Sequence, residues 1–212
     1  MNDMTVSGDF DSLSLNARPP FVLRSDDRRQ QKIPAASGLV VWLTGLPGAG
    51  KSSLAYALEK RLSGLGARAI VLDGDVVRQR LCADLGYSAA DRNENMRRID
   101  EVARLFVEQG FIVLVAMVSP TRSGRAKVRS QIPNGRFAEV FVNCRVETCM
   151  ERDPKGMYAR AKAGLIADFT GVSAEYEAPQ AAELLIDTAA ADLDHCVRGL
   201  PAFLRENFAA PG

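Results

Sequence analysis

The feature that most constrains this chain is a glycine-rich octapeptide between an apolar run and an amphipathic segment. Residues 45–52, here called the phosphate loop, read GLPGAGKS, a complete G-x-x-x-x-G-K-S pattern. The preceding run at residues 39–43 (LVVWL) is typical of a strand buried on both faces of a parallel sheet, and residues 54–65 carry apolar side chains at helical spacing. Strand, loop and helix in that order predict a nucleoside triphosphate site. A chance glycine-rich turn is the weaker alternative.

The residue types of the loop suit phosphate chemistry. Gly48 and Gly50 let the backbone curl so that successive amides point at phosphate oxygens, and the helix that follows adds its positive dipole end. We expect Lys51 to reach the β- and γ-phosphates of ATP and the Ser52 hydroxyl to ligate Mg²⁺ directly. The predicted ATP-binding residues are Gly45, Leu46, Pro47, Gly48, Ala49, Gly50, Lys51, Ser52, Ser53 and Arg152.

The rest of the chain alternates buried runs with helical segments. Further strands are predicted at residues 69–72, 111–118, 137–142 and 184–186, and further helices at 75–85, 91–108 and 192–207, with Asp91 as a cap. Short connections between alternating elements predict an α/β fold of the P-loop NTPase type, with three layers and a parallel sheet flanked by helices.

The 212 residues predict one domain with an appendage. Residues 1–37 have no sustained periodicity and are interpreted as a flexible arm or a strap, which leaves residues 38–212 as the working domain. Residues 152–178 are turn-rich and basic, so we interpret them as a C-terminal lid that closes over ATP. Within this lid, Arg152 is expected to face adenine and Lys155 to face phosphate.

Composition excludes several classes of protein. Lys plus Arg is 27 and Asp plus Glu is 26, so the net charge of +1 argues against a nucleic-acid binder or a polybasic membrane binder. No apolar run approaches the roughly 20 residues of a membrane span, and the N-terminal residues do not resemble a secretory signal. Four dispersed cysteines and a single histidine do not suggest a zinc site. We therefore expect a cytoplasmic chain with reduced thiols.

Acidic residues indicate which phosphate-loop chemistry to expect. The third predicted strand ends VAMVSP, without the aspartate of motor ATPases and GTPases, and no N-K-x-D pattern is present. Asp73 and Asp75 instead follow the second strand, whose carboxyl end should face the ligand crevice. There they can hold the water shell of Mg²⁺ and accept a proton from an attacking hydroxyl, as in a small-molecule kinase. The alternative for Asp75 is a plain helix N-cap.

Basic residues predict a second, anionic substrate. Arg78 lies one helical step after Asp75, and Arg92 and Asn95 begin the next helix. Residues 120–136 add five basic side chains and no acid, although a solvated surface is the preferred reading of Lys127 and Arg129.

The combined motifs resemble the adenylyl-sulfate kinase family, which phosphorylates adenylyl sulfate in sulfate activation. The resemblance covers about residues 38–188. It rests on LDGDVVR (72–78), DLGYSAADRNENMRRI (84–99), VSPTR (118–122), ERDPKGMY (151–158), DFTG (168–171), YEAP (176–179) and ELLIDT (183–188).

The resemblance implies roles for individual residues. Adenylyl sulfate would contact Arg78, Arg92 and Asn95, with Tyr87 stacked on its adenine and Phe169 and Thr170 covering it. Asp75 would orient or deprotonate the 3′-hydroxyl, helped by Asp73 and Lys51. Ser119 aligns with a serine described in the family as an active-site phosphoserine, although in-line transfer needs no covalent step.

The resemblance also implies a homodimer and a sulfate adenylyltransferase acting in the same pathway. The chain departs from the family at Pro47, Ala49 and Ser53 in or beside the loop, and at Gln79 and Cys82. Two other functions stay open: a sibling kinase with another nucleotide-linked or sugar acceptor, and a regulatory subunit that binds ATP without turnover.

Overall fold

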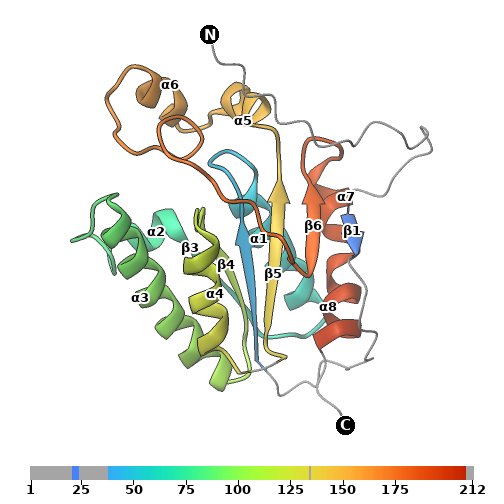
Figure 1. The fold of residues 1–212 in the computed structure, drawn as a ribbon. Coiled ribbons are helices and arrows are strands. Elements are labelled where there is room, and N and C mark those ends of the chain that lie inside the picture. The colour runs from blue at the N-terminus through green and yellow to red at the C-terminus, as the bar shows by residue number, and fades with distance from the viewer. Residues whose placement is uncertain (1–20, 24–37, 134, 209–212) are drawn as a thin grey trace.

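The computed structural model describes residues 21–23, 38–133 and 135–208. Within them, six strands form one sheet in the order β1-β6-β5-β2-β4-β3 (Figure 1). The strands are β1 (Phe21–Leu23), β2 (Leu39–Thr44), β3 (Ala69–Asp73), β4 (Ile112–Ala116), β5 (Phe137–Asn143) and β6 (Leu184–Asp187). All neighbours from β6 to β3 pair in parallel, whereas β1 runs antiparallel to β6 at the edge. The predicted parallel sheet is confirmed.

Helices cover both faces of the sheet. On one face lie α1 (Lys51–Gly64), α7 (Leu193–Arg198) and α8 (Leu200–Phe208); on the other lie α3 (Ala89–Glu108) and α4 (Arg122–Gln131) (Figure 1). The short helices α2 (Gly74–Arg78), α5 (Val146–Arg152) and α6 (Met157–Lys162) lie at the carboxyl ends of the strands. This is the expected three-layer arrangement.

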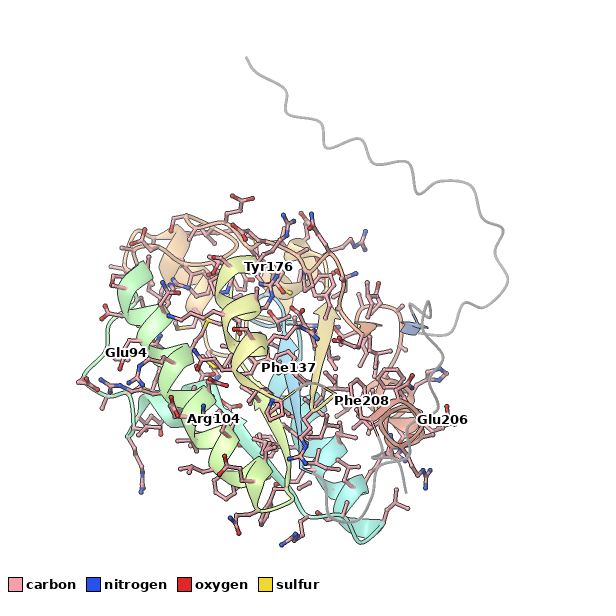
Figure 2. All side chains as sticks on the ribbon, turned by 60° about the horizontal axis from the view of Figure 1, so that its bottom comes forward. Glu94, Arg104, Phe137, Tyr176, Glu206 and Phe208 are labelled. Atoms are coloured by element: carbon pink, nitrogen blue, oxygen red, sulfur yellow. The ribbon has the colours of Figure 1, made fainter. Side chains whose placement is uncertain are left out.

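Two buried clusters hold the layers together. One packs α1, α7 and α8 on the sheet through side chains such as Leu43, Leu58 and Leu204. The other packs α3 and α4 on the opposite face and includes Trp42 and Phe137, whose rings stack with centroids 6.1 Å apart. Figure 2 views this second side, with α3 and α4 in front. Because alternate residues of β2 enter opposite clusters, β2 is buried along its whole length and apolar from Leu39 to Leu43.

Several predicted boundaries were wrong. The helix expected at 75–85 ends at Arg78 and continues as turns. The single closing helix expected at 192–207 is divided at Gly199, because Pro201 fits only the first turn of a new helix. Ser88, not Asp91, caps α3: its hydroxyl accepts the Asp91 amide at 3.1 Å and donates to the Asp91 carboxylate.

The predicted arm falls largely outside the described residues. Its described part, β1, extends the sheet by main-chain pairing with β6. Within the described ranges, no helix has the length and apolarity needed to cross a membrane. The four cysteines are free and buried.

Candidate active site

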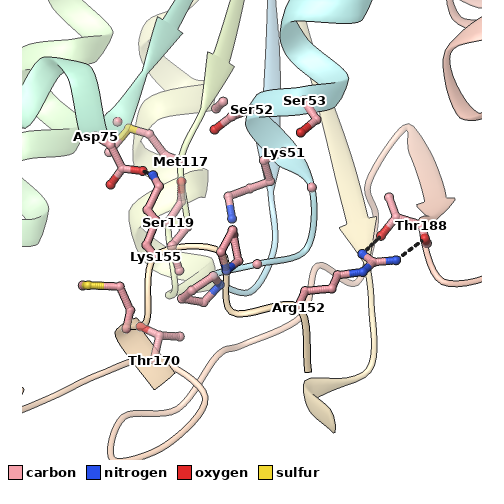
Figure 3. Close-up of a pocket in the computed structure, with 18 of the residues that line it drawn as sticks. Lys51, Ser52, Ser53, Asp75, Met117, Ser119, Arg152, Lys155, Thr170 and Thr188 are labelled. Carbon is pink, nitrogen blue, oxygen red and sulfur yellow. Dashed lines mark hydrogen bonds and ion pairs between the residues drawn. The ribbon is translucent and has the colours of Figure 1, made fainter. Parts of the chain in front are cut away.

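A cavity of about 710 Å³ lies at the carboxyl ends of the central strands, between the phosphate loop and residues 152–178, the predicted lid, for which the name lid is kept below (Figure 3). Its lining includes sixteen of the predicted site residues: Pro47, Gly48, Gly50, Lys51, Ser52, Ser53, Asp75, Arg78, Tyr87, Arg92, Asn95, Ser119, Arg152, Lys155, Phe169 and Thr170. Side chains more than a hundred residues apart in the sequence thus meet in one place.

Four predicted residues do not line the cavity: Gly45, Leu46, Ala49 and Asp73. The first three hold the loop in place through their backbone carbonyls. The carbonyls of Gly45 and Leu46 accept hydrogen bonds from Lys51, and the carbonyl of buried Ala49 accepts one from Thr188. Their expected role as direct ATP contacts therefore stays a prediction.

The loop backbone explains two of its glycines. Gly48 has φ of +76°, and a Cβ there would lie 3.0 Å from the carbonyl oxygen of Cys149. Gly50 has φ of +92° and is the N-cap of α1, with no side chain to cap the first turn. The amides at the start of α1 are thereby left to bind an anion, which the helix dipole also favours.

Lys51 is the buried cation of the loop. Its Nζ donates to the carbonyls of Gly45 at 2.9 Å and Leu46 at 2.7 Å. Burial lowers the pKa of Lys51 to about 8, although Asp75 and Asp73 oppose that shift. The ammonium is therefore held without a direct carboxylate partner, ready to neutralise phosphate charge.

The two aspartates after β3 have different roles. Asp73 is buried and caps α2: its carboxylate accepts the Asp75 amide at 2.9 Å. The alternative reading of Asp75 as the cap is therefore wrong. Asp75 lines the cavity and is paired with Lys155 of the lid (Figure 3). Burial by itself would lower the pKa of Lys155, but the ion pair with Asp75 outweighs it and raises this pKa above its ordinary value.

The opposite end of the cavity is basic and aromatic. The guanidinium of Arg78 lies 4.5 Å from the centroid of the Tyr87 ring and donates to the Gly86 carbonyl. Arg92 donates to the Thr170 hydroxyl at 2.9 Å and to the Asp168 carbonyl. These two hydrogen bonds join α3 to the lid. A half-exposed Tyr87 ring beside two arginines suits a purine with an anionic substituent.

Asn95 and Phe169 complete this end. Asn95 lines the cavity but is only 2% exposed, and its buried Oδ1 accepts no hydrogen bond from the residues that the structure describes. Phe169 packs edge-on against Tyr158 with ring centroids 5.1 Å apart. Phe169 is therefore positioned by a ring of α6.

At the other end, Arg152 is held beside the phosphate loop. It donates to the carbonyl of Thr188 at 2.7 Å and to its hydroxyl at 3.2 Å, as Figure 3 shows. Thr188 in turn donates to the Ala49 carbonyl at 2.8 Å. The guanidinium plane therefore has a fixed position at the cavity wall, where a nucleotide base can stack.

Ser119 is a strained residue in the cavity wall. It is only 2% exposed and has φ of +44°, the left-handed region that non-glycine residues rarely adopt. Its hydroxyl accepts a hydrogen bond from the indole of Trp42 at 2.8 Å. This hydrogen bond fixes the position of the Ser119 hydroxyl. It also gives the buried indole N–H of Trp42 in β2 an acceptor.

Sequence reasoning missed two residues that hold the site. The Tyr158 hydroxyl donates to the Pro47 carbonyl at 2.9 Å and ties α6 of the lid to the loop. Thr188 connects Arg152 with the loop, as described above. Their positions in ERDPKGMY and ELLIDT were the available signal, but only the three-dimensional contacts show their partners.

The donor atoms of the cavity fit Mg²⁺. The Ser52 hydroxyl and the Asp75 carboxylate are hard oxygen donors, and Mg²⁺ usually keeps waters and substrate phosphates as its other ligands. In the described part of the chain, no three His, Cys, Asp or Glu side chains gather into a site that could hold a metal alone. Such a site suits a metal that arrives with a nucleotide.

A phosphate loop after β2, a carboxylate after β3 and a second basic end define this chain as a phosphate-loop kinase. The family model described as adenylylsulphate kinase matches residues 37–187. The chain therefore belongs to the adenylyl-sulfate kinase family.

Known proteins agree with this assignment. The adenylyl-sulfate kinase of Shewanella denitrificans is 52% identical over 166 residues, covering 78% of this chain and 81% of its own. That of Shewanella sp. strain ANA-3 is 49% identical over 179 residues, covering 84% and 87%. The Mycobacterium tuberculosis APS kinase CysC, solved in complex with AMPPNP and APS, is 41% identical with a TM-score of 0.76 and covers 80% of this chain and 98% of its own.

Proposed function

We propose that this chain transfers the γ-phosphoryl group of ATP to the 3′-hydroxyl of adenylyl sulfate, giving 3′-phosphoadenylyl sulfate and ADP. The observation that carries this proposal is the single cavity with a phosphate loop at one end, a basic and aromatic end at the other, and Asp75 as a lining carboxylate. The relative from Mycobacterium tuberculosis, which was solved with an ATP analogue and APS together, supports two nucleotide sites in one such cavity.

In the proposed mechanism, Lys51 and the loop amides bind the β- and γ-phosphates and stabilise the charge of the transition state. Asp75 orients the 3′-hydroxyl and accepts its proton as the new P–O bond forms. Asp73 acts through Asp75, because its carboxylate accepts the Asp75 amide and fixes the start of α2. Lys155, which pairs with Asp75 here, would turn to the transferring phosphate when both substrates are bound.

Mg²⁺ would be held by the Ser52 hydroxyl, with Asp75 acting through its water shell and Asp73 contributing only by fixing the position of Asp75. When bound, it supplies charge neutralisation of the ATP phosphates. Arg152 would stack on the adenine of ATP. At the acceptor end, Arg78, Arg92 and Asn95 would bind adenylyl sulfate, Tyr87 would stack on its adenine, and Phe169 and Thr170 would cover it.

The proposed mechanism needs no intermediate phosphorylated on Ser119. Its hydroxyl is buried against Trp42, and both substrates can occupy the cavity for direct in-line transfer. The proposal also includes residues 152–178 as the lid, a homodimeric assembly, a cytoplasmic location, and a sulfate adenylyltransferase as the enzyme that supplies adenylyl sulfate.

The sibling-kinase alternative depended on the departures at Gln79 and Cys82. Neither residue lines the cavity, and Cys82 is fully buried. The geometry therefore favours adenylyl sulfate as the acceptor.

An acceptor that lacks one hydroxyl tests the proposed transfer. Adenylyl sulfate should yield a product with a 3′-phosphate, identified by mass spectrometry and phosphorus NMR. The 3′-deoxy analogue should compete with adenylyl sulfate for binding but remain unphosphorylated. Phosphorylation of the 3′-deoxy analogue, or of the 2′-hydroxyl in adenylyl sulfate, would refute the proposed position of transfer.

A further inference from the structure

Arg125 is a buried arginine on α4 that does not line the cavity and has no role in the proposed chemistry. Its side chain is 3% exposed, yet every nitrogen of the guanidinium has an acceptor. The acceptors come from three separate segments: Glu139, Ser119 and Glu177.

The first contact is with the cavity wall. Arg125 Nη1 donates to the carbonyl of Ser119 at 2.6 Å, at the residue with the strained positive φ. Residues 117–120 line the cavity and follow β4, which lies between β2 and β3 in the sheet. These four residues, here called the 117–120 wall, therefore lie between the phosphate loop and Asp75, where the proposed mechanism places the acceptor hydroxyl.

The second contact is with the end of the lid. Arg125 Nη2 donates to the carbonyl of Glu177 at 2.7 Å, in the segment through which the chain leaves the lid. The same segment is fastened again to the wall, because the Glu177 amide donates to the Pro120 carbonyl at 2.8 Å and its carboxylate accepts the Arg122 amide at 2.6 Å. One guanidinium thus spans the wall and the exit of the lid.

The third contact is an ion pair with a carboxylate. Arg125 Nε donates at 2.6 Å to Glu139, a largely buried carboxylate on β5. Buried ion pairs often add little net stability compared with apolar side chains of similar size, so stability alone does not account for this pair. The planar fork of arginine can reach three fixed acceptors at once, which a lysine ammonium on its single stem cannot reproduce.

We propose that Arg125 is a positioning residue of this kinase, which fixes the 117–120 wall to the lid exit at 175–178 and so sets the acceptor site beside Asp75. This inference rests on the proposed function for the identity of the acceptor. It goes further by assigning the wall-to-lid connection to one residue outside the cavity.

The variant Arg125→Lys tests the proposal, with Arg129→Lys as the matched control. Arg129 lies one helical turn later and also pairs with Glu139 and Glu183, but no described contact joins it to the wall or the lid exit. Arg125→Lys should lower kcat/KM for adenylyl sulfate about tenfold, the effect of losing one charged hydrogen bond, and change the Kd for ATP less than about twofold. Arg129→Lys should leave both constants near wild type.

Amide hydrogen exchange gives a second readout that needs no substrate. Exchange should become faster in residues 117–119 and 175–178 of Arg125→Lys and stay unchanged there in Arg129→Lys. A general loss of stability with unchanged kcat/KM, or equal effects of both variants, would overturn the positioning role.

If Arg125→Lys does not fold, the double variant Arg125→Met, Glu139→Met removes both buried charges together and provides the same test. Wild-type protein that fails to turn over adenylyl sulfate would refute the proposed function. The exchange result would still decide whether Arg125 connects the two segments.

Discussion

At the scale of single residues, the site depends on groups whose environment is set from other parts of the chain. Lys51 follows directly from the loop motif, but its lowered pKa arises from burial in the folded protein, which the motif alone does not reveal. Asp75 likewise follows from the end of β3, whereas its partner Lys155 comes from the lid. The motif therefore supplies the reactive groups, and the fold sets their charge.

The pKa of Lys51 predicts a specific pH dependence. With a pKa of about 8 in the free protein, the ammonium is charged below that pH and neutral above it. Phosphate binding needs the charged form, so kcat/KM for ATP should fall as the pH rises from about 7 to about 9. Initial rates at ATP concentrations well below KM, recorded across this pH range, measure kcat/KM for ATP. A profile that stays flat up to about pH 10 would show that Lys51 keeps an ordinary pKa.

Removing the carboxylate of Asp75 should separate binding from turnover. Asp75→Asn should lower kcat by about 10² to 10⁴, the usual contribution of a general base, and leave the Kd for ATP near wild type. The control is Asp84→Asn, because Asp84 is an exposed aspartate paired with Arg98 outside the cavity. Near-normal turnover of Asp75→Asn would remove this residue from the mechanism.

At the scale of elements, the lid is connected to the phosphate loop by few contacts. Tyr158 on α6 donates to the Pro47 carbonyl, and Phe169 packs on the Tyr158 ring. Burial raises the pKa of Tyr158 well above its ordinary value, so its hydroxyl remains a donor throughout the working range. Tyr158 thus ties α6 directly to the phosphate loop, whereas other contacts of this segment lead to α2, α3 and α4.

Tyr158→Phe keeps the ring packing but removes the hydrogen bond to the loop. Because the loss of one such bond costs about 1 kcal/mol, KM for ATP should rise roughly threefold to tenfold. Tyr56→Phe is the control, since Tyr56 is half-exposed on α1 and does not line the cavity. Equal KM values for the two variants would show that this bond does not position the lid.

Much of the fold could be predicted because the signals are local. β2, the phosphate loop and α1 form one continuous pattern, and the other parallel strands are short apolar runs. Ser88 could also have been identified as the α3 cap, since Ser followed three residues later by Asp is a capping signature.

Other features depend on distant contacts. The helix expected at 75–85 ends at Arg78, and in the turns that follow the Leu81 carbonyl accepts a hydrogen bond from Arg98 of α3, a partner that helical spacing does not reveal. Likewise, three residues without periodicity do not predict β1, which forms by pairing with β6. In the site, the residue types were predictable, but the Asp73 cap, the Lys155–Asp75 pair and the Arg125 contacts required the structure.

At the scale of the whole molecule, the near-neutral charge conceals an uneven distribution. The chain carries a net charge of only +1, yet the cavity is lined by more cations than carboxylates: Lys51, Arg78, Arg92, Arg152 and Lys155 against Asp75, Asp153 and Asp192. Charged side chains that converge on a concave site raise the local concentration of oppositely charged ligands. An excess of cations in the cavity of a nearly neutral chain suits two small anions, as ATP and adenylyl sulfate are.

The central claim is that both anions react together in this cavity, and the initial rate of ADP release from Mg-ATP tests it most directly. We predict a very low rate with ATP alone and strong stimulation by adenylyl sulfate. Stimulation only by another sugar or nucleotide-linked acceptor would contradict the claim in favour of a sibling kinase. Tight ATP binding with no ADP release under any condition would contradict it in favour of a regulatory subunit.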